Sequence, residues 1–128
     1  MSGTLLDEWL EKAEENFRVA VRENRYTKEP AHDTVCFNAQ QCAEKHLKAF
    51  LVRHRIAISK THDLDDLRQR CEQIDSTFTL VADSLRELYR YAGDIRYPGA
   101  RATKQDAREA VAAMKQVRQF VRQRLGLK

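Results

Sequence analysis

The chain has 128 residues, of which 42% are hydrophobic and 33% charged, and its formal net charge is +4. This length and apolar content fit one domain, residues 1–128, with a hydrophobic core of its own. Four glycines and two prolines are too few for the turns of a multi-stranded β fold, so we expect an all-α protein.

Two long helices are predicted in the first half of the chain. Residues 4–25 place apolar side chains at helical spacing: Leu6, Trp9, Leu10, Ala13, Phe17, Ala20 and Val21. Pro30 ends this pattern because it disfavours helical geometry in the residue before it. Residues 33–54 are apolar around most of the helix circumference, which predicts a central helix.

Three further helices are predicted in the second half. Residues 63–74 form a short helix that Thr61 or Asp63 can cap. Residues 79–96 carry an apolar seam, and Pro98 limits that helix at its end. Residues 103–125 have an apolar face that includes Met114, and Gly126 can stop the helix. We therefore expect an up-down bundle of four to five helices.

Cysteine content and hydropathy indicate a cellular location. Three cysteines without a Cys-x-x-Cys pair are typical of free thiols in a reducing cytosol. No apolar run approaches the roughly 18 residues that span a bilayer, and the first residues do not have the pattern of a signal peptide. We expect a cytoplasmic protein that does not engage a membrane.

One polar stripe crosses the otherwise apolar helix 33–54. Gln41, Lys45 and Lys48 follow Asn38 at spacings of three and four residues and therefore share one side. We expect this stripe to be exposed and to face solvent, a partner or a ligand. Glu44 lies beside it and can pair with Lys48 one turn later.

The segment 94–99 combines a planar cation with an aromatic ring. Arg96 and Tyr97 precede Pro98, and an arginine beside a tyrosine suits contacts with phosphate and with a base. The alternative is structural: Tyr97 packs on the end of the bundle while Arg96 pairs with a carboxylate.

The basic C-terminal part of the chain also has two interpretations. Residues 101–128 contain eight basic and two acidic side chains. They can attract phosphates, or the last of them can complement the negative end of a helix. No metal-ligand spacing and no phosphate-binding glycine loop occurs, so we expect no metal site and no cofactor.

Three motifs in order resemble the HEPN family (higher eukaryotes and prokaryotes nucleotide-binding). They are the Asn-Ala-Gln-Gln-Cys-Ala-Glu-Lys-His-Leu-Lys-Ala segment (38–49), Thr-His-Asp-Leu (61–64) and Ile-Arg-Tyr-Pro-Gly (95–99). Trp9, Ala13 and Tyr91 fit as well. The resemblance implies a helical bundle that usually forms a homodimer. It also implies a small nucleotidyltransferase as partner, in arrangements similar to toxin–antitoxin pairs.

Many members of that family are metal-independent ribonucleases with an Arg-x4–6-His motif on a late helix, and others bind nucleotides or RNA. Here Arg25-x6-His32 and Arg55-x6-His62 match the motif formally, but the fourth and fifth predicted helices contain no histidine. The favoured interpretation is thus a nucleotide- or RNA-binding module without catalytic residues. A ribonuclease toxin and a non-catalytic dimerisation domain are the alternatives.

We predict a phosphate-selective cleft that the second helix, the start of the third and the segment after the fourth build together. Its contacts would be Lys45, Lys48, His62, Arg96 and Tyr97, with Gln41, Glu44 and Tyr91 in support. We also predict a homodimer, because the seam of Val81, Leu85, Leu88 and Ala92 is more apolar than a small bundle needs.

Overall fold

The computed structural model describes residues 3–58, 60–91 and 98–128 of the chain. Its elements are α1 (Leu5–Arg25), α2 (His32–Arg53), α3 (Leu64–Glu72), the short 3-10 helix η1 (Ser76–Val81), α4 (Ala82–Tyr89) and α5 (Lys104–Arg124). No strand occurs in these three ranges, so the all-α prediction is confirmed. None of the helices described is long and apolar enough to cross a membrane.

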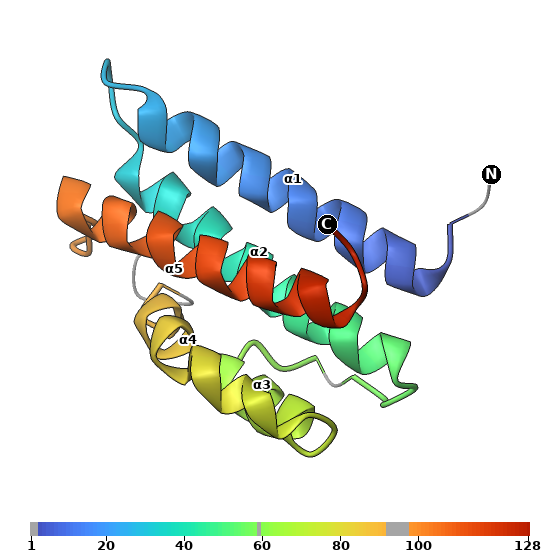
Figure 1. The fold of residues 1–128 in the computed structure, drawn as a ribbon. Helices are drawn as coiled ribbons and strands as arrows, with labels where there is room; N and C mark the ends of the chain where they lie inside the picture. Colours follow the sequence, from blue (N-terminus) through green and yellow to red (C-terminus); the bar gives the residue numbers. More distant parts are fainter. Residues whose placement is uncertain (1–2, 59, 92–97) are drawn as a thin grey trace.

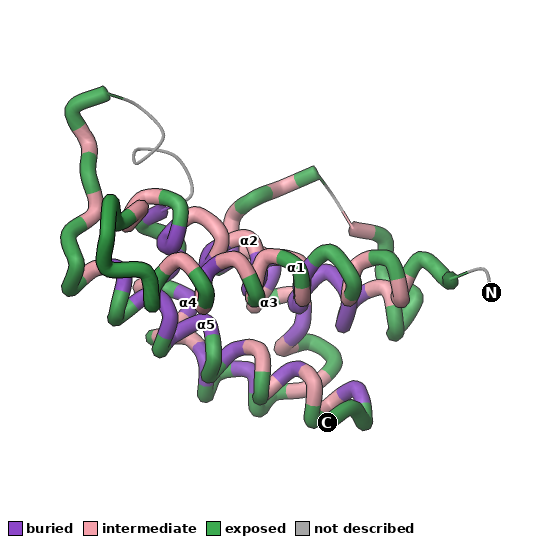
Figure 2. Tube along the Cα trace, turned by 90° about the horizontal axis from the view of Figure 1, so that it is seen from above, coloured by how far each residue is buried: buried purple, intermediate pink, exposed green. Residues whose placement is uncertain are grey.

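The three long helices form the body of the molecule, with α2 packed against both α1 and α5 (Figure 1). The short helices α3 and α4 cover the side of α2 and α5 opposite α1. Buried positions surround the axis of α2, as expected of a central helix (Figure 2). Phe50, Phe78 and Met114 are among the large side chains of this core.

The helices begin and end where local side-chain chemistry favours it. Thr4 with Asp7 and Thr103 with Asp106 form complete capping boxes at the starts of α1 and α5. Asp63 caps α3. Gly126 follows α5 with a φ of +75°, a left-handed conformation that glycine adopts without steric cost.

The fourth predicted helix differs most from the structure. Instead of one helix over 79–96, the chain forms η1 and then the two-turn helix α4, which ends at Tyr89. The Asp75 side chain accepts a hydrogen bond from the backbone N–H of Thr77 and so starts a 3-10 turn before the α-helix can begin. Residues 92–97 of the prediction lie outside the described residues.

The apolar seam is not exposed, so the prediction of a homodimer cannot be based on this seam, and that part of the argument is wrong. Val81, Leu85 and Leu88 are 5%, 1% and 0% exposed, because they pack into the core of the same chain. Ala92 lies outside the described residues. A short helix over a small bundle needs its whole apolar face for that packing, so the seam carries no information about a partner.

Candidate functional site

The polar stripe of α2 faces α1 rather than solvent, which corrects the predicted exposure. Lys48 is 4% exposed, and Lys45 is only partly exposed. The Lys45 ammonium donates to Asn16 Oδ1 of α1 at 2.7 Å, and the Asn16 amide donates to Asn38 Oδ1 at 2.8 Å. Burial is the main cause that lowers the pKa of Lys45. The stripe is therefore mostly an interhelical contact.

Glu44 is the centre of a buried charged cluster on α2. Its carboxylate accepts hydrogen bonds from the Lys48 ammonium and from the Gln40 amide, both at 3.1 Å. Glu44 and Lys48 side chains are 3% and 5% exposed. The Lys48 Nζ also lies 5.4 Å from the centroid of the Trp9 ring of α1. Glu44 therefore positions Lys48, as the i, i+4 spacing predicted.

The imidazole of His62 connects this cluster to the surface. Its Nδ1 lies 3.0 Å and 3.1 Å from the two carboxylate oxygens of Glu44. The His62 side chain is nevertheless 66% exposed. Because the carboxylate accepts the hydrogen on Nδ1, the other ring nitrogen is free to meet a ligand. Lys48, Glu44 and His62 thus come together as predicted, with His62 as the accessible member.

Two N–H groups at the start of α3 are already hydrogen-bonded and do not face a phosphate. The Asp63 carboxylate accepts hydrogen bonds from the backbone N–H groups of Asp65 and Asp66, at 3.0 Å and 3.1 Å. These donors were expected to attract an anion together with His62, but the cap already satisfies them. The imidazole itself is therefore the main polar contact that this part of the site presents.

Tyr91, a predicted supporting residue, lies elsewhere. It is 3% exposed, and its hydroxyl donates to Glu87 Oε1 at 3.4 Å. Its phenol also interacts with Cys36 of α2. Cys36 and Glu44 are eight residues apart on one helix, which corresponds to about 12 Å.

Arg96 and Tyr97, the remaining predicted contacts, lie outside the described residues. Gln41 reaches the Glu44 cluster through Gln40, to which its amide donates at 2.7 Å.

A second polar network was missed by the sequence analysis. Glu14 of α1 accepts two hydrogen bonds from the Arg118 guanidinium of α5, at 2.7 Å and 2.6 Å. His46 of α2 is fully buried, with Nε2 3.7 Å from Glu14 Oε2. Burial lowers the pKa of His46 to about 4, so this imidazole is neutral. The pair joins residues 104 positions apart, and no local pattern could reveal it.

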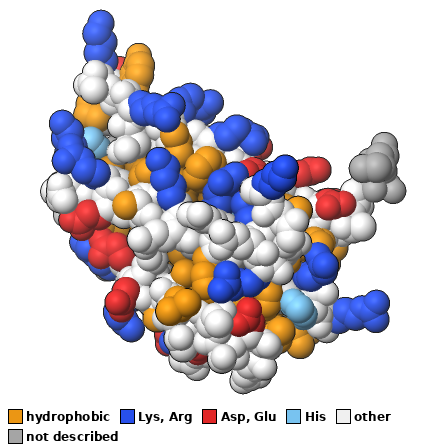
Figure 3. Space-filling view, in the orientation of Figure 1, with side chains coloured by type: hydrophobic (Ala, Val, Ile, Leu, Met, Phe, Trp, Pro, Cys, Tyr) orange, Lys and Arg blue, Asp and Glu red, His pale blue; other side chains and the backbone are white. Residues whose placement is uncertain are grey.

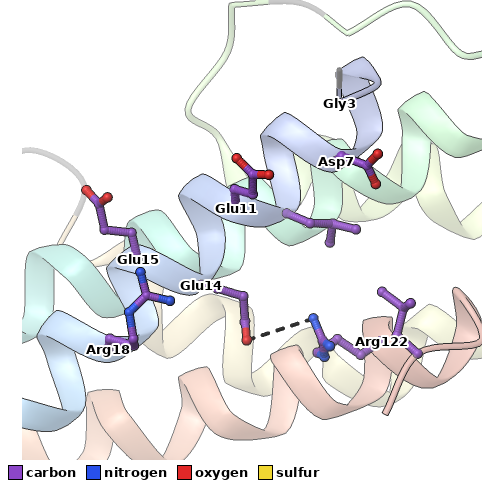
Figure 4. A pocket seen from close by; sticks show the side chains of 9 residues that line it. Gly3, Asp7, Glu11, Glu14, Glu15, Arg18 and Arg122 are labelled. Carbon is purple, nitrogen blue, oxygen red and sulfur yellow. Dashed lines mark ion pairs between the residues drawn. The ribbon is translucent and has the colours of Figure 1, made fainter. Parts of the chain in front are cut away.

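Glu14 also lines a groove with a volume of about 670 Å³ between α1 and the end of α5. Figure 4 shows Arg122 reaching toward Glu14 across this groove, and the two side chains are 3.9 Å apart. Glu11 and Glu15 line it as well, so carboxylates outnumber cations there. This groove is therefore unsuited to phosphate.

No metal centre is formed by the residues that the structure describes, since no group of three or more potential ligands converges among them. The three cysteines are buried free thiols. Burial raises the pKa values of Cys36 and Cys71 to about 12 and also raises that of Cys42, so none of them is an activated nucleophile.

Comparisons with known proteins agree with this architecture. The family model for the HEPN domain matches residues 6–124. The crystal structure of ST0689, an archaeal HEPN homologue, superposes with a TM-score of 0.68 at 21% sequence identity, over 95% of this chain and 98% of that chain. No curated protein matches the chain. The match over nearly the whole sequence, together with the helical architecture, shows that the chain belongs to the HEPN domain family.

Proposed function

We propose that this protein is a nucleotide- or RNA-binding module in which His62 contacts a phosphate of the ligand. The observation that carries the proposal is the exposed imidazole held by a buried ion pair. Burying Glu44 and Lys48 costs desolvation free energy, and apolar residues of similar volume would stabilise the fold as well or better. In this proposal the buried Glu44–Lys48 pair is explained by function, because it orients the accessible imidazole of His62.

The chemistry follows from the two nitrogens of the ring. Glu44 holds the hydrogen on Nδ1, and protonation of the other nitrogen makes it a charged donor to a phosphate oxygen. Lys48 balances the charge of Glu44 from inside the bundle. In this proposal Lys45, Arg96 and Tyr97 complete the contacts to the ligand, while Gln41 and Glu44 support them.

A titration tests the proposal. ATP, GTP and a short single-stranded RNA are titrated into the wild type, His62→Gln and Arg96→Ala. For a ligand that the wild type binds, each substitution should weaken binding by about 1.5–3 kcal/mol, the scale of a hydrogen bond to a charged group. His54→Gln is the matched control because it removes another exposed histidine. Unchanged affinity of His62→Gln would reject the site.

A second candidate function is an endoribonuclease, favoured by one specific contact. A carboxylate on Nδ1 of an exposed imidazole leaves the other nitrogen able to accept a proton, as a general base does. Incubation of labelled RNA with the wild type, His62→Ala and Glu44→Gln tests it. Cleavage by the wild type that both variants lose would support catalysis, and intact RNA in all three samples would reject it.

We further propose a small nucleotidyltransferase as partner, in a system similar to toxin–antitoxin pairs. The support is the family resemblance, and the test is whether a neighbouring open reading frame encodes such a protein and copurifies with this one. If neither ligand nor catalysis is found, the non-catalytic interaction domain becomes the better description.

A homodimer is proposed on the same grounds. One exposed apolar residue supports it: Leu80 is 75% exposed and lines a hollow of about 280 Å³ between η1 and α5. Light scattering at tens of micromolar protein tests the dimer, and a strict monomer would reject it.

A further inference from the structure

Two adjacent hollows lie at one end of the bundle, where the α1–α2 connection meets the segment before α5. Each has a volume of about 150 Å³, and Pro30 and His32 line both of them. Tyr26, Lys104 and Arg108 line one hollow, and Arg101 lines the other. In Figure 3, Lys and Arg side chains gather along the upper left of the molecule, where Figure 1 places this end.

One hydrogen bond holds the two sides of this end together. Asp33, at the start of α2, accepts a hydrogen bond at 2.6 Å from the backbone N–H of Ala102. The bond fixes the segment before α5 beside the α1–α2 connection, although the two residues are 69 positions apart. It also occupies one oxygen of Asp33, an acidic side chain that lines a hollow.

Three cations at this end are uncompensated. Arg101, Lys104 and Arg108 are exposed, and none of them forms an ion pair with any residue that the structure describes. Lys104 and Arg108 are one turn apart on α5, and Arg101, which precedes the helix, lines the adjacent hollow. We call these three residues the cationic cluster.

The position of the cationic cluster costs stability. It lies at the N-terminal end of α5, where the helix dipole is positive and favours anions rather than cations. Like charges one turn apart add repulsion. The usual explanation for surface cations, that they complement a helix C-terminus, therefore fails here. A bound anion would relieve both effects. The capping box occupies the N–H groups of Thr103 and Asp106, and the exposed cationic side chains supply the main attraction for an anion.

An exposed aromatic ring indicates which class of anion the cationic cluster binds. Tyr26 is 58% exposed and shares a hollow with Lys104 and Arg108. An accessible tyrosine beside cations is the combination with which proteins hold single-stranded nucleic acids, the ring stacking on a base while the cations contact phosphates. A simple phosphate ion would make no use of the ring.

We propose that the cationic cluster and Tyr26 form a binding surface for single-stranded RNA. The surface is separate from His62: His32 and Glu44 are twelve residues apart on α2, about 18 Å along its axis. The inference rests on the proposed function only in that both take a nucleotide-containing ligand. Arg101, Lys104 and Arg108 contact the backbone, and Tyr26 stacks on one base.

Fluorescence anisotropy with a labelled 12-nucleotide single-stranded RNA, between 50 and 200 mM KCl, tests the surface. Lys104→Ala/Arg108→Ala should weaken binding about tenfold at low salt and reduce the slope of log K against log salt by about 1.4, the value for two lost phosphate contacts. Arg70→Ala/Arg86→Ala removes the same charge from α3 and α4 and should leave both quantities unchanged.

The aromatic contact has its own pair of variants. Tyr26→Ala should weaken binding about fivefold, the lower end for loss of one stacked base, whereas Tyr26→Phe keeps the ring and should bind as the wild type does. Two results together would overturn the RNA proposal: inorganic polyphosphate displaces the labelled RNA with the same efficiency as unlabelled RNA, and Tyr26→Ala binds the labelled RNA with wild-type affinity. The surface would then bind polyanions in general.

Two further results would overturn it. One is that the wild type binds no RNA at 50 mM KCl. In that case the proposed function is still tested separately, by the nucleotide titration with His62→Gln. The other is a double variant that binds RNA normally but changes the oligomeric state in light scattering, which would make this surface a protein interface. Circular dichroism of each variant confirms that it is folded.

Discussion

His62 and Glu44 form a contact between an exposed imidazole and a buried carboxylate, with Nδ1 3.0 Å and 3.1 Å from the two oxygens. The two residues are 18 positions apart, on α2 and just before α3. The contact attaches the connection between these helices to the central helix at one point. It also links the only strongly accessible member of the cluster to a charge pair that solvent does not reach.

Removing one partner of the buried Glu44–Lys48 pair should destabilise the protein. Glu44→Ala leaves the Lys48 ammonium, 4% exposed, without its carboxylate, and we expect a loss of about 3–5 kcal/mol in the free energy of unfolding. Urea denaturation at pH 7 measures it. Glu44→Leu/Lys48→Met removes both charges together and should recover most of the loss. A double variant as unstable as Glu44→Ala would contradict this account.

Stability should depend on pH through His46. Burial lowers its pKa in the folded protein to about 4, whereas the unfolded chain has the ordinary value near 6.5. The unfolded state therefore binds the proton first as the pH falls. The stabilisation is complete above pH 6.5 and about 3 kcal/mol of it is lost by pH 4. Glu14, Arg118, Arg122 and Cys42 are the titratable groups around the ring.

Urea denaturation at several pH values between 4 and 7 measures this loss. His46→Leu should show a flatter dependence on pH over that interval, because the variant has no buried imidazole to protonate. His54→Gln, which removes an exposed imidazole, should keep the dependence of the wild type. Parallel curves for His46→Leu and the wild type would show that His46 is not the cause.

The cysteines should be unreactive in the folded protein. Cys36, Cys42 and Cys71 are 0% exposed, and burial raises their pKa values. A thiol reagent such as DTNB at pH 8 should modify all three quickly in denaturant and none at a comparable rate in native buffer. Rapid labelling of one thiol in native buffer would contradict the burial of that side chain.

Asp33→Ala should loosen the start of α5. It removes the acceptor of the Ala102 N–H, and we expect a loss of about 1–2 kcal/mol. Hydrogen exchange of the Ala102 amide should accelerate in this variant. Asp83→Ala is a suitable control, since its exposed carboxylate pairs with Arg86 within α4. Equal exchange of the Ala102 amide in wild type and Asp33→Ala would refute the role of this bond.

Helical spacing of apolar residues and local capping chemistry were enough to predict the long helices. The ends of α1, α2 and α5 fall within one or two residues of the predicted ones. The pattern failed at η1 because an Asx turn at Asp75 competes with the α-helix, and hydrophobic spacing does not report that competition.

The site was predictable only in its local part. Glu44 and Lys48 pair within one helix, so their spacing reveals them. Exposure of Lys48 was predicted wrongly because a lysine on a helix is normally at the surface, whereas here tertiary packing, which includes Trp9 of α1, buries it. Glu14 and Arg118 meet through the tertiary fold alone, so a single sequence gives no sign of their contact.

The amides of Asn16 and Asn38 and the ammonium of Lys45 also decide how α1 and α2 are aligned. Most other contacts between these helices are apolar and non-directional, and such contacts tolerate sliding. Moving α1 along α2 by one turn, about 5.4 Å, would separate Asn16 from both Asn38 and Lys45 and leave these partly buried groups without their hydrogen bonds across the interface. This polar contact therefore selects one register for the two helices and excludes the neighbouring ones.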